Sequence, residues 1–153
     1  MEFINRVIHA LTELHPTHPM LVHFPIALTG AAFLFILLAY WRNNASLEQT
    51  AFANIVLASF GTLAAGITGY LDNIKNYVGD APNAGTKIIL ATVLLILSSG
   101  ISIVRFRNPD LFQKSNRFPK STGTIVLYIA SYGLSFAIAL VLAFLGGVIL
   151  YGF

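Results

Sequence analysis

The chain has 153 residues, of which 56% are hydrophobic and only 10% are charged. Soluble domains carry about 25% charged residues. Nine Lys and Arg against six Asp and Glu give a net charge of +3, and the mean hydropathy is +0.75. This composition argues against a soluble enzyme, a disordered regulator or a nucleic-acid-binding protein, and it predicts an integral membrane protein. The chain contains no cysteine, which excludes disulfides, iron–sulfur clusters and thiolate metal sites.

Residues 1–17 predict an amphipathic helix followed by a linker, separate from the membrane domain that we expect over 18–153. Five apolar side chains recur on one helical face, while most of the polar side chains lie off it. The apolar positions are Ile4, Val7, Ile8, Leu11 and Leu14. A helix of this kind lies on a membrane surface, on the bundle or on a partner rather than crossing the bilayer.

Four apolar runs are long enough to cross the hydrocarbon core, which is roughly 30 Å thick and needs about 20 helical residues. They cover about residues 21–41, 51–71, 87–104 and 125–150. None contains an internal charged residue, and Lys87 lies at the start of the third run, where its stem can reach the interface. The sequence thus predicts an all-α fold, a four-helix transmembrane bundle with an N-terminal interfacial helix.

The basic residues predict how the bundle is oriented. Six follow the first and third runs, and three lie on the opposite side of the membrane. The six are Arg42, Arg105, Arg107, Lys114, Arg117 and Lys120, and the three are Arg6, Lys75 and Lys87. By the positive-inside rule, both termini and the connection 72–86 face outward. The cytoplasmic face then offers only a basic loop, so we expect any chemistry or docking on the outer face.

Small residues predict how the helices pack. Gly61, Ala65 and Gly69 repeat every four residues along the second run, which allows a neighbouring backbone to approach closely. We expect residues 98–100 of the third run and the pair Gly146-Gly147 of the fourth run to serve in the same way.

All four histidines lie within the first 23 residues of the chain. They are His9, His15, His18 and His23. Pro19 and Pro25 bracket the start of the first run, so its helix begins near Pro19 and bends at Pro25, or it begins near Phe24. In either case His23 lies at or just below the outer interface, where an imidazole is costly unless it has a partner.

His23 is a candidate axial ligand for a haem or a chlorin pigment, because helical bundles hold such groups through side chains of facing helices. The second, third and fourth runs contain no histidine. A second haem ligand would therefore come from another N-terminal histidine, from Lys87 or from a neighbouring subunit. A five-coordinate pigment needs only one histidine.

Other interpretations of the histidines stay open. The segment mixes imidazole and thioether groups, which suit copper. These candidate metal ligands are His15, His18, Met20 and His23. An imidazole at a membrane face could instead relay protons, although the apolar runs contain no carboxylate to receive them. In the purely structural interpretation, the histidines bond carbonyl groups near the start of the helix.

The segment His18–Ile26 (HPMLVHFPI) resembles the opening motif of a bacterial family of four-span membrane domains of unassigned function. Gly66–Asp72 (GITGYLD) resembles that family's motif at the end of the second span, and residues 146–152 resemble its closing motif. Members of the family stand beside, or are fused to, Rieske-type and cytochrome-type electron-transfer modules. The resemblance implies a multi-pass protein of the bacterial inner membrane in a redox setting. Lys87 is a departure, because the family often has a histidine near this position.

Four polar positions are expected together at the outer face. His18 and His23 begin the first run, Asp72 follows the second and Lys87 opens the third. We take these four as candidate cofactor-binding residues, in which Asp72 pairs with Lys87 or orients an imidazole.

We therefore expect a small accessory subunit of a respiratory or photosynthetic electron-transfer complex, embedded in lipid and bound to other membrane subunits. The alternative is a stand-alone membrane protein that carries its own b-type haem. A copper-binding protein and a small-solute transporter are less favoured, the latter because charges and clear inverted repeats are missing from the runs. No residue pattern suggests a nucleophile with its base or a hydrolytic metal site, so we do not expect an enzyme.

Overall fold

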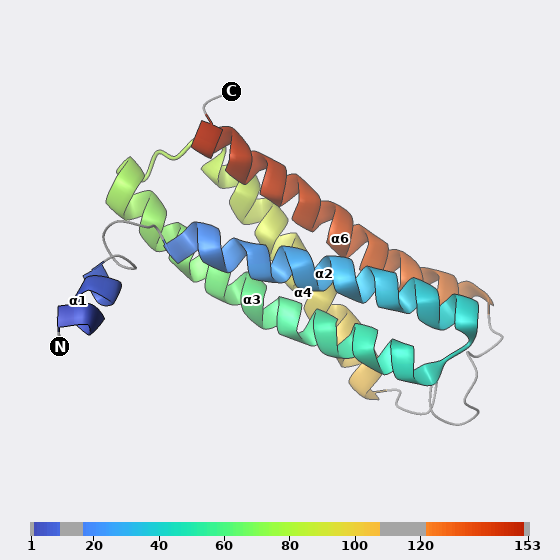
Figure 1. Ribbon diagram of the computed structural model, residues 1–153. Coiled ribbons are helices and arrows are strands. Elements are labelled where there is room, and N and C mark those ends of the chain that lie inside the picture. The colour runs from blue at the N-terminus through green and yellow to red at the C-terminus, as the bar shows by residue number, and fades with distance from the viewer. Residues whose placement is uncertain (1, 10–16, 108–121, 152–153) are drawn as a thin grey trace.

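The computed structural model describes residues 2–9, 17–107 and 122–151, and these parts of the chain are helical with short turns (Figure 1). A short helix, α1 (Glu2–His9), precedes four long ones. The long helices are α2 (Thr17–Arg42), α3 (Ala45–Tyr77), α4 (Ala84–Arg107) and α6 (Thr122–Tyr151). All four are long and apolar enough to cross a membrane. The predicted all-α fold with four candidate spans is confirmed.

The four long helices form a closed bundle. α2 packs against α3 and α6, and α4 packs against the same two helices, so each helix has two neighbours. Successive helices run in opposite directions (Figure 1). We call the end where α2 stops at Arg42 and α4 stops at Arg107 the arginine end. The opposite end, where α2 begins with Thr17 and His18, is the histidine end.

Each long helix extends beyond the apolar run from which it was predicted. α3 begins early because Asn44 caps it, with its side-chain oxygen accepting from the backbone N–H groups of Ser46 (2.8 Å) and Leu47 (3.3 Å). α3 ends at Tyr77, and the following cap residue Val78 has a left-handed φ of 52° and donates its N–H to the carbonyl of Asn73. The Asn73 side chain then fixes the turn, because its oxygen accepts from the N–H of Ala81 (2.9 Å).

The predicted small-residue stripe of α3 lies against α2. An added Cβ at Gly61 would lie 2.9 Å from the Phe24 ring and 3.4 Å from the backbone nitrogen of Pro25. An added Cβ at Gly69 would lie 2.7 Å from the ring of His18. The expected close approach of the α2 and α3 backbones is confirmed for this stripe.

α2 and α6 pack through a reciprocal pair of aromatic rings and glycines. The Phe33 ring lies over Gly133, the Phe136 ring lies over Gly30, and the two ring centroids are 6.1 Å apart.

The small-residue contacts that were predicted for the third and fourth runs are only partly present. Among the described residues, nothing lies within 4 Å of an added Cβ at Gly100, Gly146 or Gly147, so the expectation is wrong for these glycines, whereas Ser98 of the same predicted set is fully buried.

The core is concentrated toward the arginine end. In the described parts of the long helices, the buried residues fall within 25–39, 48–65, 94–105 and 125–139. Towards the histidine end, the described stretches 18–24, 66–77, 84–93 and 140–148 contain half-buried and exposed residues. The bundle is therefore tightly packed at one end and loosely packed at the other.

The outside of the bundle is apolar, as a bilayer requires. Phe60, Ile96, Leu127 and Phe144 are each exposed over roughly two thirds of their surface, between 65% and 71%. Large exposed apolar surfaces of this kind indicate contact with lipid or with partner proteins. α1 stands apart from the bundle (Figure 1), with Phe3 and Ile4 exposed. The remaining part of the predicted interfacial segment, including Leu11 and Leu14, lies outside the described residues.

Two glycines of α3 provide a test of the α2–α3 packing. Gly61→Ala should destabilise the protein by about 1–3 kcal/mol, because the new methyl group would lie 2.9 Å from the Phe24 ring and 3.2 Å from the ring Cδ of Pro25, which is fixed to the backbone. Gly66→Ala is the matched control, since nothing lies within 4 Å of its added Cβ. It should stabilise the helix by about 0.5–1 kcal/mol. The free energy of unfolding in detergent measures both effects. Equal changes in the Gly61→Ala and Gly66→Ala variants would contradict the close approach of α2 and α3 at Gly61.

Candidate functional site

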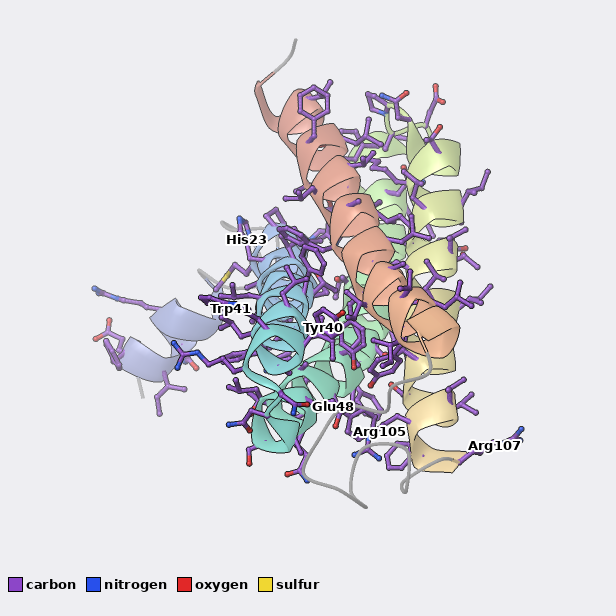
Figure 2. The ribbon with its side chains drawn as sticks, turned by 90° about the vertical axis from the view of Figure 1, so that its right-hand side faces the viewer. His23, Tyr40, Trp41, Glu48, Arg105 and Arg107 are labelled. Atoms are coloured by element: carbon purple, nitrogen blue, oxygen red, sulfur yellow. The ribbon has the colours of Figure 1, made fainter. Side chains whose placement is uncertain are left out.

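His23 lies near the start of α2 with its side chain exposed (Figure 2). Its Nδ1 atom bonds the backbone carbonyl of Pro19, one turn earlier in the helix. When Nδ1–H donates to a carbonyl, Nε2 carries the free electron pair, and this is a common arrangement of imidazoles that ligate metals. The geometry therefore fits His23 as one ligand of a cofactor bound outside the bundle.

His18 is placed differently. Its ring is half-buried between α2 and α3, packed on Gly69, with Nδ1 3.3 Å from the hydroxyl oxygen of Thr68. Five residues separate His18 from His23, which turns the two side chains about 140° apart around the helix axis. The two histidines therefore point in different directions, and His18 takes part in helix packing.

Asp72 and Lys87 lie within electrostatic range of the His18 ring and of each other. The predicted Asp72–Lys87 ion pair is not among the ion pairs of the described residues. A carboxylate oxygen of Asp72 accepts a hydrogen bond from the side-chain amide of Asn76. The structure thus brings together three of the four candidate cofactor-binding residues, and His23 is the one that points elsewhere.

The candidate copper ligands are only partly within the described chain. His15 lies outside it, and Met20 is exposed over 60% of its surface. In residues 2–9, 17–107 and 122–151, no group of three or more His, Asp and Glu side chains is arranged to hold a metal ion.

A buried pair of charged residues lies at the arginine end, where sequence analysis placed no site. Glu48 of α3 is fully buried, and Arg105 of α4 is 6% exposed. The two form an ion pair, with Arg105 Nε 2.9 Å from Glu48 Oε1 and a terminal nitrogen of Arg105 3.2 Å from Oε2. Figure 2 shows both residues at the arginine end of the bundle, where α3 begins and α4 ends.

Two tyrosines of α6 complete this buried network. The hydroxyl of Tyr128 donates to Glu48 Oε1 at 2.9 Å, and it lies 3.0 Å from the hydroxyl of Tyr132. Because the Tyr128 proton is directed at the carboxylate, its oxygen accepts from Tyr132. The guanidinium carbon of Arg105 lies 5.6 Å from the centre of the Phe52 ring. The network therefore satisfies both charges and joins α3, α4 and α6.

The expectation that the arginine end offers only a basic loop is wrong. Arg105 was counted among the loop cations, whereas it lies inside α4 and is paired. The signal that could have revealed this is the helical spacing. Glu48 precedes Ala51, Ile55 and Ala58 at intervals of three and four residues, which puts it on the buried face of α3.

A shallow apolar groove runs along the outside of the bundle between α2 and α6. It has a volume of about 380 Å³. The lining residues are Phe33, Leu37, Tyr40, Ile125, Val126, Ile129, Ala130 and Gly133. Its lining contains no histidine and no charged residue.

Removing one partner of the buried ion pair should strongly destabilise the bundle. We expect Glu48→Gln to cost about 3–5 kcal/mol, because it leaves the Arg105 charge uncompensated in the core. Tyr128→Phe should cost less, about 1.5–3 kcal/mol, since it removes a hydrogen bond to a charged group.

The double variant Glu48→Gln/Arg105→Met should recover part of the loss, because it removes both charges. Unfolding in detergent measures these variants, together with the single variant Arg105→Met, against the unmodified chain. An additive double variant would contradict direct coupling between Glu48 and Arg105.

Comparison with known proteins gives a family for this chain. A family model described as a predicted membrane protein, DUF2231, matches residues 14–153. No curated protein matches, and no solved structure matches. The matched region contains the four long helices, the histidines of α2 and the buried network. The chain therefore belongs to the DUF2231 family of predicted membrane proteins.

Proposed function

We propose that this protein is a small accessory subunit of a membrane electron-transfer complex, and that it docks to its partner at the histidine end. The observation that supports this is the placement of His23. The ring is exposed on the surface of the bundle, and the bond from Nδ1 to the Pro19 carbonyl orients Nε2 for a ligand. An exposed and oriented imidazole suits a cofactor that lies between this chain and a neighbouring subunit. It suits a cofactor enclosed within the four helices less well.

The cofactor in this proposal is a haem b or a chlorin pigment, which would supply electron transfer or light absorption. This chain would hold it through His23 alone. α3, α4 and α6 contain no histidine, and the ring of His18 is packed against Gly69. A second axial ligand would then come from the partner subunit. The proposal assigns no catalytic reaction to this chain.

The alternative is a stand-alone b-type haem protein. It would need an axial ligand that points into the bundle, and α2 turns His23 outward. The described core near the middle of the bundle is filled by Ile36, Ile55 and Leu94, which are nearly or fully buried. These observations favour a cofactor at the surface over one inside the four helices.

The proposal includes a location in the bacterial cytoplasmic membrane, with the histidine end facing outward. Exposed Arg42 and Arg107 at the opposite end support this orientation, because cationic residues favour the cytoplasmic side. Tyr40 and Trp41, also exposed there, are typical of residues at a membrane interface (Figure 2).

Orientation can be tested with reporter fusions after Phe153. We expect alkaline phosphatase, which requires export, to be active in this position, and green fluorescent protein, which folds in the cytoplasm, to remain dark. Fusions after Asn44, at the arginine end, are the matched control and should give the opposite pattern. A fluorescent C-terminal fusion would contradict the proposed orientation.

The ligand role can be tested on tagged protein extracted from its native membranes in mild detergent. We expect the extract to contain partner subunits together with haem or pigment absorbance. His23→Ala should lower that absorbance at least fivefold, because it removes the proposed ligand. His18→Ala is the control and should retain the absorbance.

Two outcomes would contradict the proposal. A stoichiometric haem spectrum from the isolated chain would favour the stand-alone protein. An unchanged absorbance in the His23→Ala extract would show that His23 is not the ligand.

A further inference from the structure

The inside of the bundle contains a series of buried hydroxyl groups in addition to the Glu48 network. They come from all four long helices and belong to Thr29 of α2, Thr62 of α3, Ser98 and Ser102 of α4, and Ser135 of α6. Each hydroxyl donates to a backbone carbonyl one turn earlier in its own helix, at 2.8 or 2.9 Å. Its oxygen can also accept a hydrogen bond, because a hydroxyl is both donor and acceptor. The core is therefore not purely apolar.

On α4 and α6, which pack against each other, the buried polar side chains follow the same spacing. Each helix has three of them within two turns, at intervals of three and four residues, which places them on one helix face. They are Ser98, Ser102 and Arg105 of α4, and Tyr128, Tyr132 and Ser135 of α6. From the ion pair to Ser98 and Ser135, both helices rise about 10 Å toward the histidine end. The buried network thus continues as a polar strip between α4 and α6.

A further hydroxyl, on α2, lies near the height of Ser135. Thr29 adjoins Gly30, and an added Cβ at Gly30 would lie 3.0 Å from the ring of Phe136, the residue after Ser135. Thr29 and Ser135 are both fully buried. Because both are enclosed by the bundle at similar heights, Thr29 extends the polar strip to α2.

α3 extends the series to the histidine end. The neighbour of Thr62, Gly61, packs on α2 about one turn beyond Thr29. Gly69 lies two turns beyond Thr62 on the same face of α3, and the ring of His18 is packed on it. The hydroxyl of Thr62 therefore lies between the polar strip and the imidazole.

The series is as long as the hydrocarbon core is thick. The 21 residues from Glu48 to Gly69 correspond to about 31 Å of helix. The hydrocarbon core measures roughly 30 Å. Glu48 therefore lies near one boundary of the membrane and His18 near the other, where Asp72 and Lys87 are within electrostatic range of its ring.

The chemistry of the series suits protons rather than metal cations. A metal cation needs several oxygen ligands to replace its hydration shell. Among the described residues, no group of three or more His, Asp and Glu side chains is arranged to hold one, and the charge of Arg105 beside Glu48 opposes it. A proton needs only neighbouring groups that both accept and donate hydrogen bonds, as hydroxyl and imidazole groups do.

We propose that the four long helices enclose a proton pathway between His18 at the histidine end and Glu48 at the arginine end. The buried hydroxyls carry the proton, and water molecules bridge the longer intervals on either side of Thr62. Each group accepts a proton from one neighbour as it passes its own proton to the next, so no group is oxidised or reduced.

The last steps of the pathway follow the hydrogen bonds at the arginine end. Tyr132 passes its proton to Tyr128 while Tyr128 passes its own proton to Glu48, which releases it at the arginine end. The pathway does not include His23, so it does not depend on the function proposed above.

Proton flux into liposomes tests the pathway. The full-length protein is reconstituted around a trapped pH-sensitive dye, and a potassium gradient with valinomycin drives protons inward. We expect the unmodified chain to acidify the lumen at least fivefold faster than protein-free vesicles. Thr62→Val should lower the protein-dependent flux at least fivefold, because valine has the shape of threonine without the hydroxyl. Thr62→Ser keeps the hydroxyl and should conduct.

Thr92→Val is the matched control and should conduct like the unmodified chain. The exposed hydroxyl of Thr92 donates to a carbonyl of its own helix in the same way, but it lies outside the series. Ser135→Ala tests a second point of the pathway and should also lower the flux at least fivefold, and circular dichroism checks that each variant stays helical.

Three outcomes would overturn the proposal. The first is a flux through the unmodified chain no faster than that of protein-free vesicles. The second is normal conduction by a helical Thr62→Val or Ser135→Ala variant. The third is an equal loss of flux in Thr92→Val, which would show that the loss does not depend on the series.

Discussion

A carboxylate and a guanidinium can stay ionised inside a membrane bundle only if each satisfies the other, and this requirement governs the arginine end. Glu48 is fully buried, so α4 must place Arg105 beside it, and α6 must place Tyr128 within reach of the same oxygen. Three helices are thereby fixed in rotation and in height. Apolar packing alone does not impose this, since lipid tails and leucine side chains are similarly apolar.

The consequence is a bundle with two different ends. Close packing at the arginine end leaves the histidine end with half-buried and exposed residues in all four long helices. Polar groups there, such as His18, Asp72 and Lys87, interact at longer range and across helices. An end of this kind has surface available for a partner, whereas at the arginine end Glu48, Arg105 and Tyr128 bind one another inside the bundle.

Composition and run length were sufficient to predict four long helices, and the four-residue spacing of Gly61, Ala65 and Gly69 predicted the face that meets α2. The helix ends were missed because hydropathy does not reveal them: the side chain of Asn44 caps the start of α3, and the left-handed backbone of Val78 ends it. Glu48 was missed because the apolar runs were ended at charged residues. The helical spacing of the buried face of α3 nevertheless continues through Glu48. The prediction for Gly146 and Gly147 was wrong, because a glycine allows another helix to approach closely but does not show that a helix lies beside it.

The length of α3 has a consequence for any protein that meets the histidine end. Its 33 residues make a rod of about 50 Å, whereas the hydrocarbon core is about 30 Å thick. About 20 Å of α3 therefore exceeds the hydrocarbon, and the polar residues Asp72, Asn73 and Lys75 favour placing this excess at the histidine end, where the Asn73-anchored turn follows. α3 acts as a rigid spacer, and a partner resting on this turn would be held at a fixed height above the lipid.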